Sequence, residues 1–189
     1  RFMERQLWCR EFQGSEPVGK GPIIIVLDES GSMCGERNHA AKALALALAW
    51  IARQQKRWCA LIAYSGDSGE RILPLPLGKW DEVALMNWLE AFIGQGSDLD
   101  VPVREMPKFY ESLKAPKGKT DLIFLTDAAC NISGKLAKIF IDWKRSVQAK
   151  LITLVIDSEP VDLVKISDEV HRIRSVDVSE YGVERILSL

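Results

Sequence analysis

Hydrophobic and polar positions fall into alternating blocks along the chain. Short, uninterrupted apolar runs rich in Ile, Val and Leu are separated by longer segments in which apolar residues recur with helical spacing. The first kind of block favours parallel strands buried on both faces, and the second favours helices that pack one side against a sheet. The pattern predicts strands at residues 23–27, 58–64, 71–77, 122–126, 151–156 and 173–178.

The helical blocks lie between and after these runs, at residues 38–54, 80–93, 103–113, 135–149, 161–170 and 181–189. Strands that alternate with helices predict an α/β fold, with a doubly wound, mostly parallel six-stranded sheet and helices on both faces. Pro74 and Pro76 lie in the third predicted strand, at 71–77, and proline lacks the backbone donor that a central strand needs. We therefore expect 71–77 to be an edge strand. The helix at 38–54 is apolar almost all round and should be largely buried.

The pattern indicates one domain at residues 21–189, preceded by a lead-in segment at 1–20. Apolar residues in the lead-in suit a short strand or a docking segment, and its Gly and Pro residues indicate a loop. The string at 14–20 is close to a phosphate-binding loop, but Gly21 replaces the required Ser or Thr and the string precedes a strand. Because the first residue is Arg1 rather than Met, we interpret the chain as a piece of a longer protein.

Composition narrows the class of protein. A chain of 189 residues, with 47% hydrophobic and 27% charged residues, is typical of a globular domain with a full core. A net charge of −1 gives no electrostatic drive toward nucleic acid or an anionic membrane. No apolar run approaches the roughly 20 residues that span a bilayer. The cysteines (Cys9, Cys34, Cys59 and Cys130) form no C-x-x-C pair, which favours a reducing, cytoplasmic setting.

A polar cluster follows the first apolar run abruptly. Asp28, Ser30 and Ser32 stand where the strand ends, and open α/β sheets bind ligands outside the carboxyl ends of their strands. Carboxylate and hydroxyl oxygens suit Mg²⁺ better than zinc, which prefers His and Cys. The alternative is a polar turn in which a serine caps the following helix. We expect Asp28 to lie outside the packed core.

The string Asp28-Glu-Ser-Gly-Ser32 resembles the metal-ion-dependent adhesion site of von Willebrand factor A (VWA) domains. That family brings a Thr from a second loop and an Asp from a third, and Ser97 and Asp127 stand at those places. The resemblance covers residues 20 to 189 and implies one antiparallel edge strand and a Mg²⁺ site, which Mn²⁺ would also fill. The implied metal residues are Asp28, Ser30, Ser32, Ser97 and Asp127. The serines would bind the metal directly, and the aspartates largely through water.

The resemblance also implies a protein-interaction module rather than an enzyme. The open position on the metal would accept an Asp or Glu carboxylate from a partner protein. The stretch Leu-Asp-Glu-Ser-Gly-Ser-Met, followed by an Ala/Leu-rich helix, is most similar to VWA proteins of the ViaA type. Those proteins act with MoxR-family AAA+ ATPases, so the implied partner is such an ATPase or a client protein that it remodels.

Three alternatives stay open at this stage. A Mg²⁺-dependent phosphotransfer or phosphatase domain also places Asp at strand ends, although Ser30 fills the position of the second acid that such sites generally use. An extracellular adhesive domain fits the cysteine pattern less well. A serine nucleophile with His39 as its base lacks the G-x-S-x-G elbow. Cys34 and Cys130 lie beside the first and third loops, where packing is a simpler role than redox chemistry.

Overall fold

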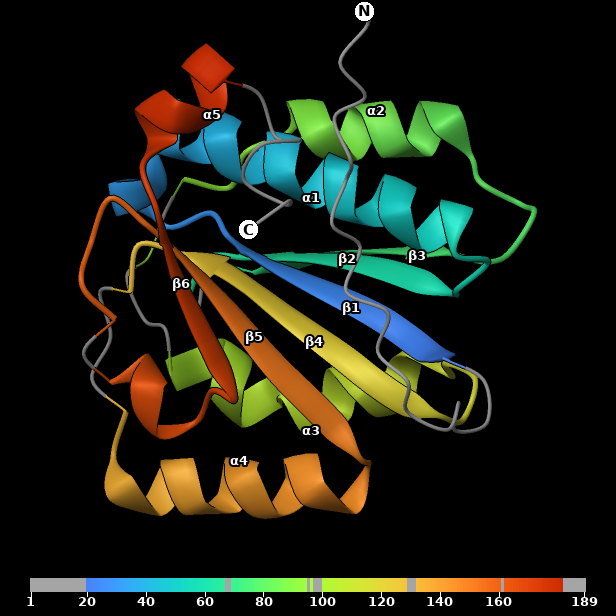
Figure 1. Ribbon diagram of the computed structural model, residues 1–189, viewed down its shortest axis with the longest axis vertical. Helices are drawn as coiled ribbons and strands as arrows, with labels where there is room; N and C mark the ends of the chain where they lie inside the picture. Colours follow the sequence, from blue (N-terminus) through green and yellow to red (C-terminus); the bar gives the residue numbers. More distant parts are fainter. Residues whose placement is uncertain are drawn as a thin grey trace, which may run out of the picture.

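The computed structural model describes residues 20–66, 69–94, 96, 100–128, 132–160 and 162–181. In this part of the chain a six-stranded sheet has the strand order β3-β2-β1-β4-β5-β6 (Figure 1). The strands are β1 (Lys20–Asp28), β2 (Cys59–Tyr64), β3 (Glu70–Leu75), β4 (Lys119–Thr126), β5 (Ala149–Ile156) and β6 (Glu169–Ile173). Neighbouring strands are parallel except β2 and β3, which are antiparallel. The predicted α/β class with an antiparallel edge strand is confirmed.

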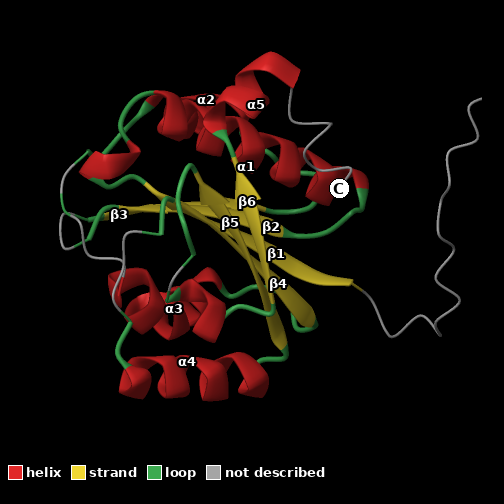
Figure 2. Cartoon of the chain, turned by 60° about the vertical axis from the view of Figure 1, so that its left-hand side comes forward, coloured by secondary structure: helices red, strands yellow, loops and turns green. Residues whose placement is uncertain are grey.

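Helices cover both faces of the sheet, as the sequence predicts (Figures 1 and 2). One face carries α1 (Glu36–Gln54), α2 (Glu82–Glu90) and α5 (Ser175–Tyr181), and the other carries α3 (Asp100–Leu113) and α4 (Gly134–Ser146).

Strand β1 separates two apolar cores. Ile23, Ile25 and Leu27 pack in the core beneath α1, whereas Ile24 and Val26 pack in the core beneath α3 and α4. None of these side chains is more than 5% exposed, which explains why the run is apolar without interruption.

Helix α1 is buried along one side only: eight of its 19 residues are buried. Trp50 is 50% exposed and lies against the guanidinium of Arg53, whose carbon is 5.2 Å from the ring centroid. Leu46, another apolar residue of α1, is 37% exposed, so the expectation of a largely buried helix holds only for the side that packs against the sheet.

The C-terminal part of the fold differs from the prediction. In place of a helix at 161–170 and a strand at 173–178, the structure has a 3₁₀ turn at Leu163–Lys165, strand β6 at Glu169–Ile173, and helix α5. Both predictions are wrong at these positions. Of the predicted helix at 181–189, the described part is Tyr181, the last residue of α5, and the rest lies outside the described residues.

The edge position of strand β6 and a contact made by the Asp157 carboxylate explain this difference. Strand β6 pairs only with β5 in the described sheet, and within β6 only Ile173 is buried, so its polar residues hide the strand pattern. The Asp157 carboxylate accepts hydrogen bonds from the Ser175 backbone at 2.8 Å and from its hydroxyl at 2.6 Å. This contact holds the first residue of α5 in a segment whose apolar residues suggest a strand.

Two helices are shorter than their patterns. Asp81 caps α2, because its carboxylate accepts from the Ala84 N–H at 2.9 Å, and the helix ends at Glu90 rather than at 93. Helix α4 ends at Ser146 because Gln148 adopts a φ of 54° and turns the chain into β5. The lead-in at 1–19 lies outside the described residues, so the predicted domain boundary stays a prediction.

Candidate metal centre

The carboxyl ends of the parallel strands meet at one edge of the sheet, on the left in Figure 1. Asp28 is the last residue of β1, and Asp127 directly follows β4, the neighbouring strand. Asp28 is fully buried and Asp127 is 3% exposed. The expectation that Asp28 lies outside the packed core is therefore wrong, because its side chain is enclosed between the ends of β1 and β4.

Hydrogen bonds hold the Asp28 carboxylate on both oxygens. Oδ1 accepts from the Ser30 backbone N–H at 2.8 Å, and Oδ2 accepts from the Thr126 hydroxyl at 2.7 Å. Burial raises the pKa of Asp28 above its ordinary value; the hydrogen bonds from Thr126 and Ser30 oppose this effect, and the charge of Asp127 adds to it. The sequence did not identify Thr126 as a site residue, yet its hydroxyl fixes the orientation of the Asp28 carboxylate.

The two serines of the first loop bring their hydroxyls together. Ser30 Oγ lies 3.0 Å from Ser32 Oγ; Ser30 is 5% exposed, whereas Ser32 is exposed. Neighbouring oxygen ligands of an octahedral Mg²⁺, each about 2.1 Å from the ion, are about 3 Å apart. The separation of the two hydroxyls therefore fits two adjacent corners of a magnesium shell.

The donor set at this edge consists of oxygen atoms. Asp28, Asp127 and the two serine hydroxyls are hard ligands that suit Mg²⁺ or Mn²⁺. Across the described ranges, no three or more His, Cys, Asp or Glu residues gather in a way that could hold a metal ion. A site here thus depends on serine hydroxyls as much as on carboxylates.

Ser97, the predicted ligand from the second loop, lies outside the described residues. The residue before it is placed, and the Gly31 N–H donates to the Gly96 carbonyl at 3.4 Å. The second loop therefore reaches the first loop at Gly96. The structure brings together Asp28, Ser30, Ser32 and Asp127, and the contribution of Ser97 stays a prediction.

Besides Thr126, the sequence prediction missed two features of the site, and Arg37 is the first of them. It lies in the first turn of α1, and its Nη1 donates to the Ser32 carbonyl and to Asp127 Oδ2, each at 3.2 Å. Its Nε lies 3.6 Å from Asp157 Oδ2. Partial burial acts to raise the pKa of Asp157, but hydrogen bonds from Ser175 and the charge of Arg37 together lower it. A guanidinium thus lies among the carboxylates of this edge.

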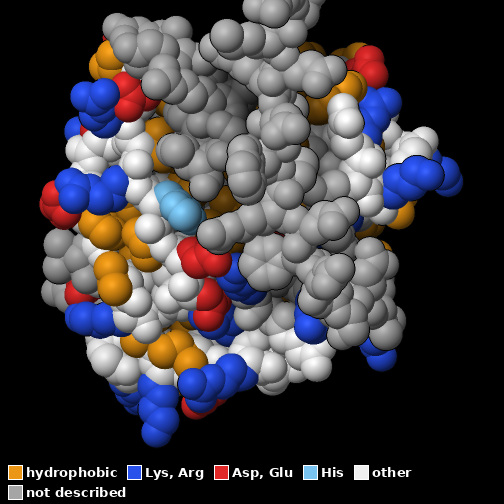
Figure 3. Space-filling model, in the orientation of Figure 1, with side chains coloured by type: hydrophobic (Ala, Val, Ile, Leu, Met, Phe, Trp, Pro, Cys, Tyr) orange, Lys and Arg blue, Asp and Glu red, His pale blue; other side chains and the backbone are white. Residues whose placement is uncertain are grey.

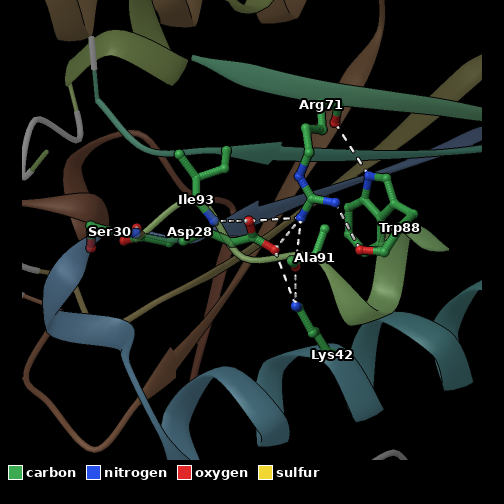
Figure 4. Close-up of polar contacts among 8 residues, drawn as sticks. Asp28, Ser30, Lys42, Arg71, Trp88, Ala91 and Ile93 are labelled. Atoms are coloured by element: carbon green, nitrogen blue, oxygen red, sulfur yellow. Dashed lines mark hydrogen bonds and ion pairs between the residues drawn. The ribbon is translucent and has the colours of Figure 1, made fainter. Parts of the chain in front are cut away.

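Glu29 is the second feature, and Figure 4 shows its surroundings. The side chain is fully buried, and Arg71 Nη2 donates to its two carboxylate oxygens at 2.6 and 2.7 Å. Lys42 Nζ lies 3.5 Å from Oε1, and the Ile93 N–H donates to Oε2 at 3.0 Å. Burial lowers the pKa of Lys42, and the Glu29 carboxylate opposes this shift. Two cations therefore balance one buried anion.

The same two cations hold the segment that leads to the second loop (Figure 4). Lys42 donates to the Ala91 carbonyl, and Arg71 donates to the carbonyls of Ala91 and Trp88 at 2.9 Å each. The Gly94 N–H donates to the Glu29 backbone carbonyl at 3.1 Å. The chain from the end of α2 to Gly94 is thus fastened to the residue beside Asp28. A lysine within an Ala/Leu-rich helix was the sequence signal that could have revealed this network.

The histidines do not support a serine nucleophile. His39 is exposed on α1, and the His171 side chain is 53% exposed on β6. Both Asp28 oxygens accept hydrogen bonds, and the Ser30 hydroxyl contacts that of Ser32. The geometry of the described residues therefore shows no histidine poised to take a serine proton.

The described cysteines are free thiols. Cys59 is buried in β2, and burial raises its pKa to about 12, so it behaves as a small apolar side chain. Cys34 is exposed beside the first loop. Cys9 and Cys130 lie outside the described residues.

A groove of about 680 Å³ lies beside the site at the ends of β5 and β6. Its lining residues are Ala128, Asp157, Ser158, Glu159, Arg172, Ile173 and Arg174. Acidic and basic side chains are interspersed on the face seen in Figure 3. The described helices include none long and apolar enough to cross a membrane.

No model of a protein family matches the chain. The uncharacterized protein MJ0811 of Methanocaldococcus jannaschii is 32% identical over 191 residues, which cover 98% of this chain and 42% of that protein. The uncharacterized protein MJ0077 of the same organism is 29% identical over 150 residues, covering 78% of this chain and 36% of that protein. The chain therefore spans less than half the length of these curated relatives.

Three solved structures are similar to the chain in fold. A von Willebrand factor type A protein from Catenulispora acidiphila aligns with a TM-score of 0.66 and 21% identity, over 88% of this chain and 42% of that one. The VWA domain of SpRpn10 aligns with a TM-score of 0.59 and 12% identity, over 82% of this chain and 88% of that domain's chain. The pilus adhesin SpaC from Lactobacillus rhamnosus GG aligns with a TM-score of 0.61 and 15% identity, over 92% and 30%. The chain has the fold of a von Willebrand factor A domain.

Proposed function

We propose that this domain is a Mg²⁺-dependent protein-interaction module that binds a carboxylate of a partner protein. The observation that carries the proposal is the pair of hydroxyls, Ser30 and Ser32, 3.0 Å apart beside the buried carboxylates Asp28 and Asp127. In this proposal Ser30, Ser32 and Ser97 hold the metal directly, and the two aspartates act largely through water. When bound, the metal supplies positive charge that attracts an Asp or Glu side chain.

The hydrogen bonds on Asp28 support binding rather than phosphotransfer. A phosphate-accepting carboxylate needs an oxygen free to attack, but both Asp28 oxygens accept hydrogen bonds and the side chain is fully buried. The bonds from Thr126 and Ser30 instead keep the carboxylate fixed beneath the serine hydroxyls. We therefore favour a non-catalytic role.

The proposed partner is a MoxR-family AAA+ ATPase, or a client protein that such an ATPase remodels. The support is the similarity of the first-loop sequence, from Leu27 to Met33, and of the Ala/Leu-rich helix α1 to VWA proteins of the ViaA type. A buried Glu29 that fastens the second loop to the first loop suits a surface that must keep its shape while a partner exerts force.

Capture of a purified MoxR-family ATPase by the immobilised domain tests the proposal. Because EDTA also removes Mg²⁺ from the nucleotide of the ATPase, the decisive comparison is between variants of the domain at constant Mg²⁺. The variant Ser30→Ala/Ser32→Ala should lose capture. Ser112→Ala/Ser146→Ala, which changes two exposed serines on α3 and α4, should keep it.

If Ser30→Ala/Ser32→Ala captured the ATPase as well as Ser112→Ala/Ser146→Ala does, the serine pair would have no role in partner binding. Turnover of acetyl phosphate or of a generic phosphatase substrate, lost in Asp28→Asn, would favour the phosphotransfer alternative instead.

A further inference from the structure

We infer that Arg37 is an internal cation that competes with the metal for the Asp127 carboxylate, an inference that rests on the proposed metal site. The guanidinium contacts three elements: the Ser32 carbonyl of the first loop, Asp127 after β4, and Asp157 after β5. It thereby ties together two of the loops that the metal would join, the first loop and the one after β4. Neither its position nor its partners follow from the serine and aspartate motif.

The contacts on Asp127 make the competition direct. Nη1 of Arg37 lies 3.2 Å from Asp127 Oδ2, a distance at which a guanidinium neutralises a carboxylate. The Asp127 side chain is 4% exposed, so water screens this pair less than an ion pair at the surface. The Arg37 side chain is 37% exposed and can therefore move outward without leaving a cavity in a core.

Charge explains why the metal and Arg37 oppose each other. Asp28, Asp127 and Asp157 all lie at this edge, and Arg37 already offsets part of the negative charge of Asp127 and Asp157. Two like charges a few ångströms apart repel each other strongly where water is partly excluded. A divalent ion that binds beside Ser30 and Ser32 must either displace the guanidinium from Asp127 or bind despite the repulsion from its positive charge.

Removal of the guanidinium charge should therefore tighten metal binding. We expect Arg37→Gln to bind Mn²⁺ about tenfold more tightly than the wild type, a change that corresponds to about 1.4 kcal/mol. Without metal, the same variant should melt at a lower temperature, since Asp127 and Asp157 lose an ion-pair partner. With saturating Mn²⁺ the deficit in melting temperature should shrink.

Two further variants separate charge from shape. Arg37→Lys keeps the positive charge and loses the planar donor fork, so its Mn²⁺ affinity should stay near that of the wild type. Arg172→Gln removes an arginine at the same edge whose partner is Glu159, and its Mn²⁺ affinity should also stay near wild type.

Calorimetric titration with Mn²⁺ and thermal melting in EDTA or in Mn²⁺ test the inference on these variants and on Ser30→Ala/Ser32→Ala. Tighter binding by Arg37→Gln alone supports it, as does Mn²⁺ binding detectable only in that variant. Equal or weaker binding by Arg37→Gln, with binding still lost in the double-serine variant, would overturn the inference and leave the metal site intact. Equal binding by the wild type and the double-serine variant, or no binding by any variant, would overturn both.

Discussion

Replacement of Glu29 by Gln tests the buried charge network beside the first loop. Glutamine has nearly the same shape as glutamate, so Glu29→Gln creates no cavity; it removes the negative charge and replaces one acceptor oxygen by an NH₂ donor. The wild-type carboxylate accepts from Arg71 at 2.6 and 2.7 Å and from the Ile93 N–H at 3.0 Å, with Lys42 at 3.5 Å. The variant leaves two cations next to a neutral amide.

The magnitude follows from the burial of the partners. Removal of one member of a buried ion pair typically costs about 3–5 kcal/mol of unfolding free energy, because the remaining charge stays desolvated. The Arg71 side chain is 25% exposed and that of Lys42 is 10% exposed, so water reduces the cost. We therefore expect a loss at the lower end of that range, about 3 kcal/mol.

Urea unfolding of the metal-free domain measures this loss. A slope of about 2 kcal/mol per molar urea converts it to a fall of about 1.5 M in the midpoint. The control is Glu105→Gln, which removes a partly exposed carboxylate from its surface pair with Lys108 on α3 and should change the midpoint far less. An unchanged midpoint in Glu29→Gln would refute the conclusion that Glu29 is the charged centre of this network.

The second consequence of Glu29→Gln concerns metal binding. The network fastens residues 91–94 to the first loop, so its loss should loosen the loop that carries Ser97. In buffer without urea, at a temperature at which both proteins are folded, the variant should bind Mn²⁺ more weakly than the wild type. Equal Mn²⁺ affinity would mean that the second loop keeps its place without Glu29.

Further predictions concern the ligands themselves. Ser97→Thr should bind Mn²⁺ at least as tightly as the wild type, because the β-branch restricts the hydroxyl rotamer, and Ser97→Ala should bind less tightly; calorimetry that gave the opposite order would place the second ligand elsewhere. Mn²⁺ binding should weaken as pH falls, starting above 3.8, because burial raises the pKa of Asp28 above that value and protonation removes its charge. In EDTA the sign reverses: the folded protein holds the Asp28 proton more tightly than the unfolded chain, so Asp28 contributes stability at low pH that is lost as pH rises through its raised pKa. Asp28→Asn should flatten the pH dependence of Mn²⁺ binding and of stability in EDTA. Calorimetric titrations and urea midpoints from pH 4 upward measure the two. A variant whose pH dependence matched that of the wild type would contradict the role of Asp28.

The central strands of the sheet and the positions of Asp28 and Asp127 at their ends could be predicted from the sequence. Strands β1, β2, β4 and β5 contain largely apolar runs because each packs against helices on both faces. Such runs show where strands end, and parallel strands end at the same edge. The polar residues that directly follow two neighbouring strands had therefore to meet.

The polar contacts of long side chains could not be predicted in this way. Arg37 and Arg71 reach carboxylates that lie 90 and 42 positions away in sequence, and no local pattern encodes such pairs. The burial of Asp28 also escaped prediction, because it depends on the Thr126 hydroxyl of a neighbouring strand. The segment from β6 to α5 was misassigned because its edge strand buries little apolar surface and the Asp157–Ser175 contact is tertiary.

Anomalous diffraction from crystals of the domain soaked in Mn²⁺ tests the central claim most directly. One anomalous peak is expected at the carboxyl edge of the sheet, bonded to the hydroxyls of Ser30 and Ser32 at about 2.1–2.2 Å, with Asp28 and Asp127 beside it. Crystals of Ser30→Ala/Ser32→Ala should lack this peak. A peak that persists in the double-serine variant, or a wild-type crystal whose anomalous density lies elsewhere on the domain, would contradict the account.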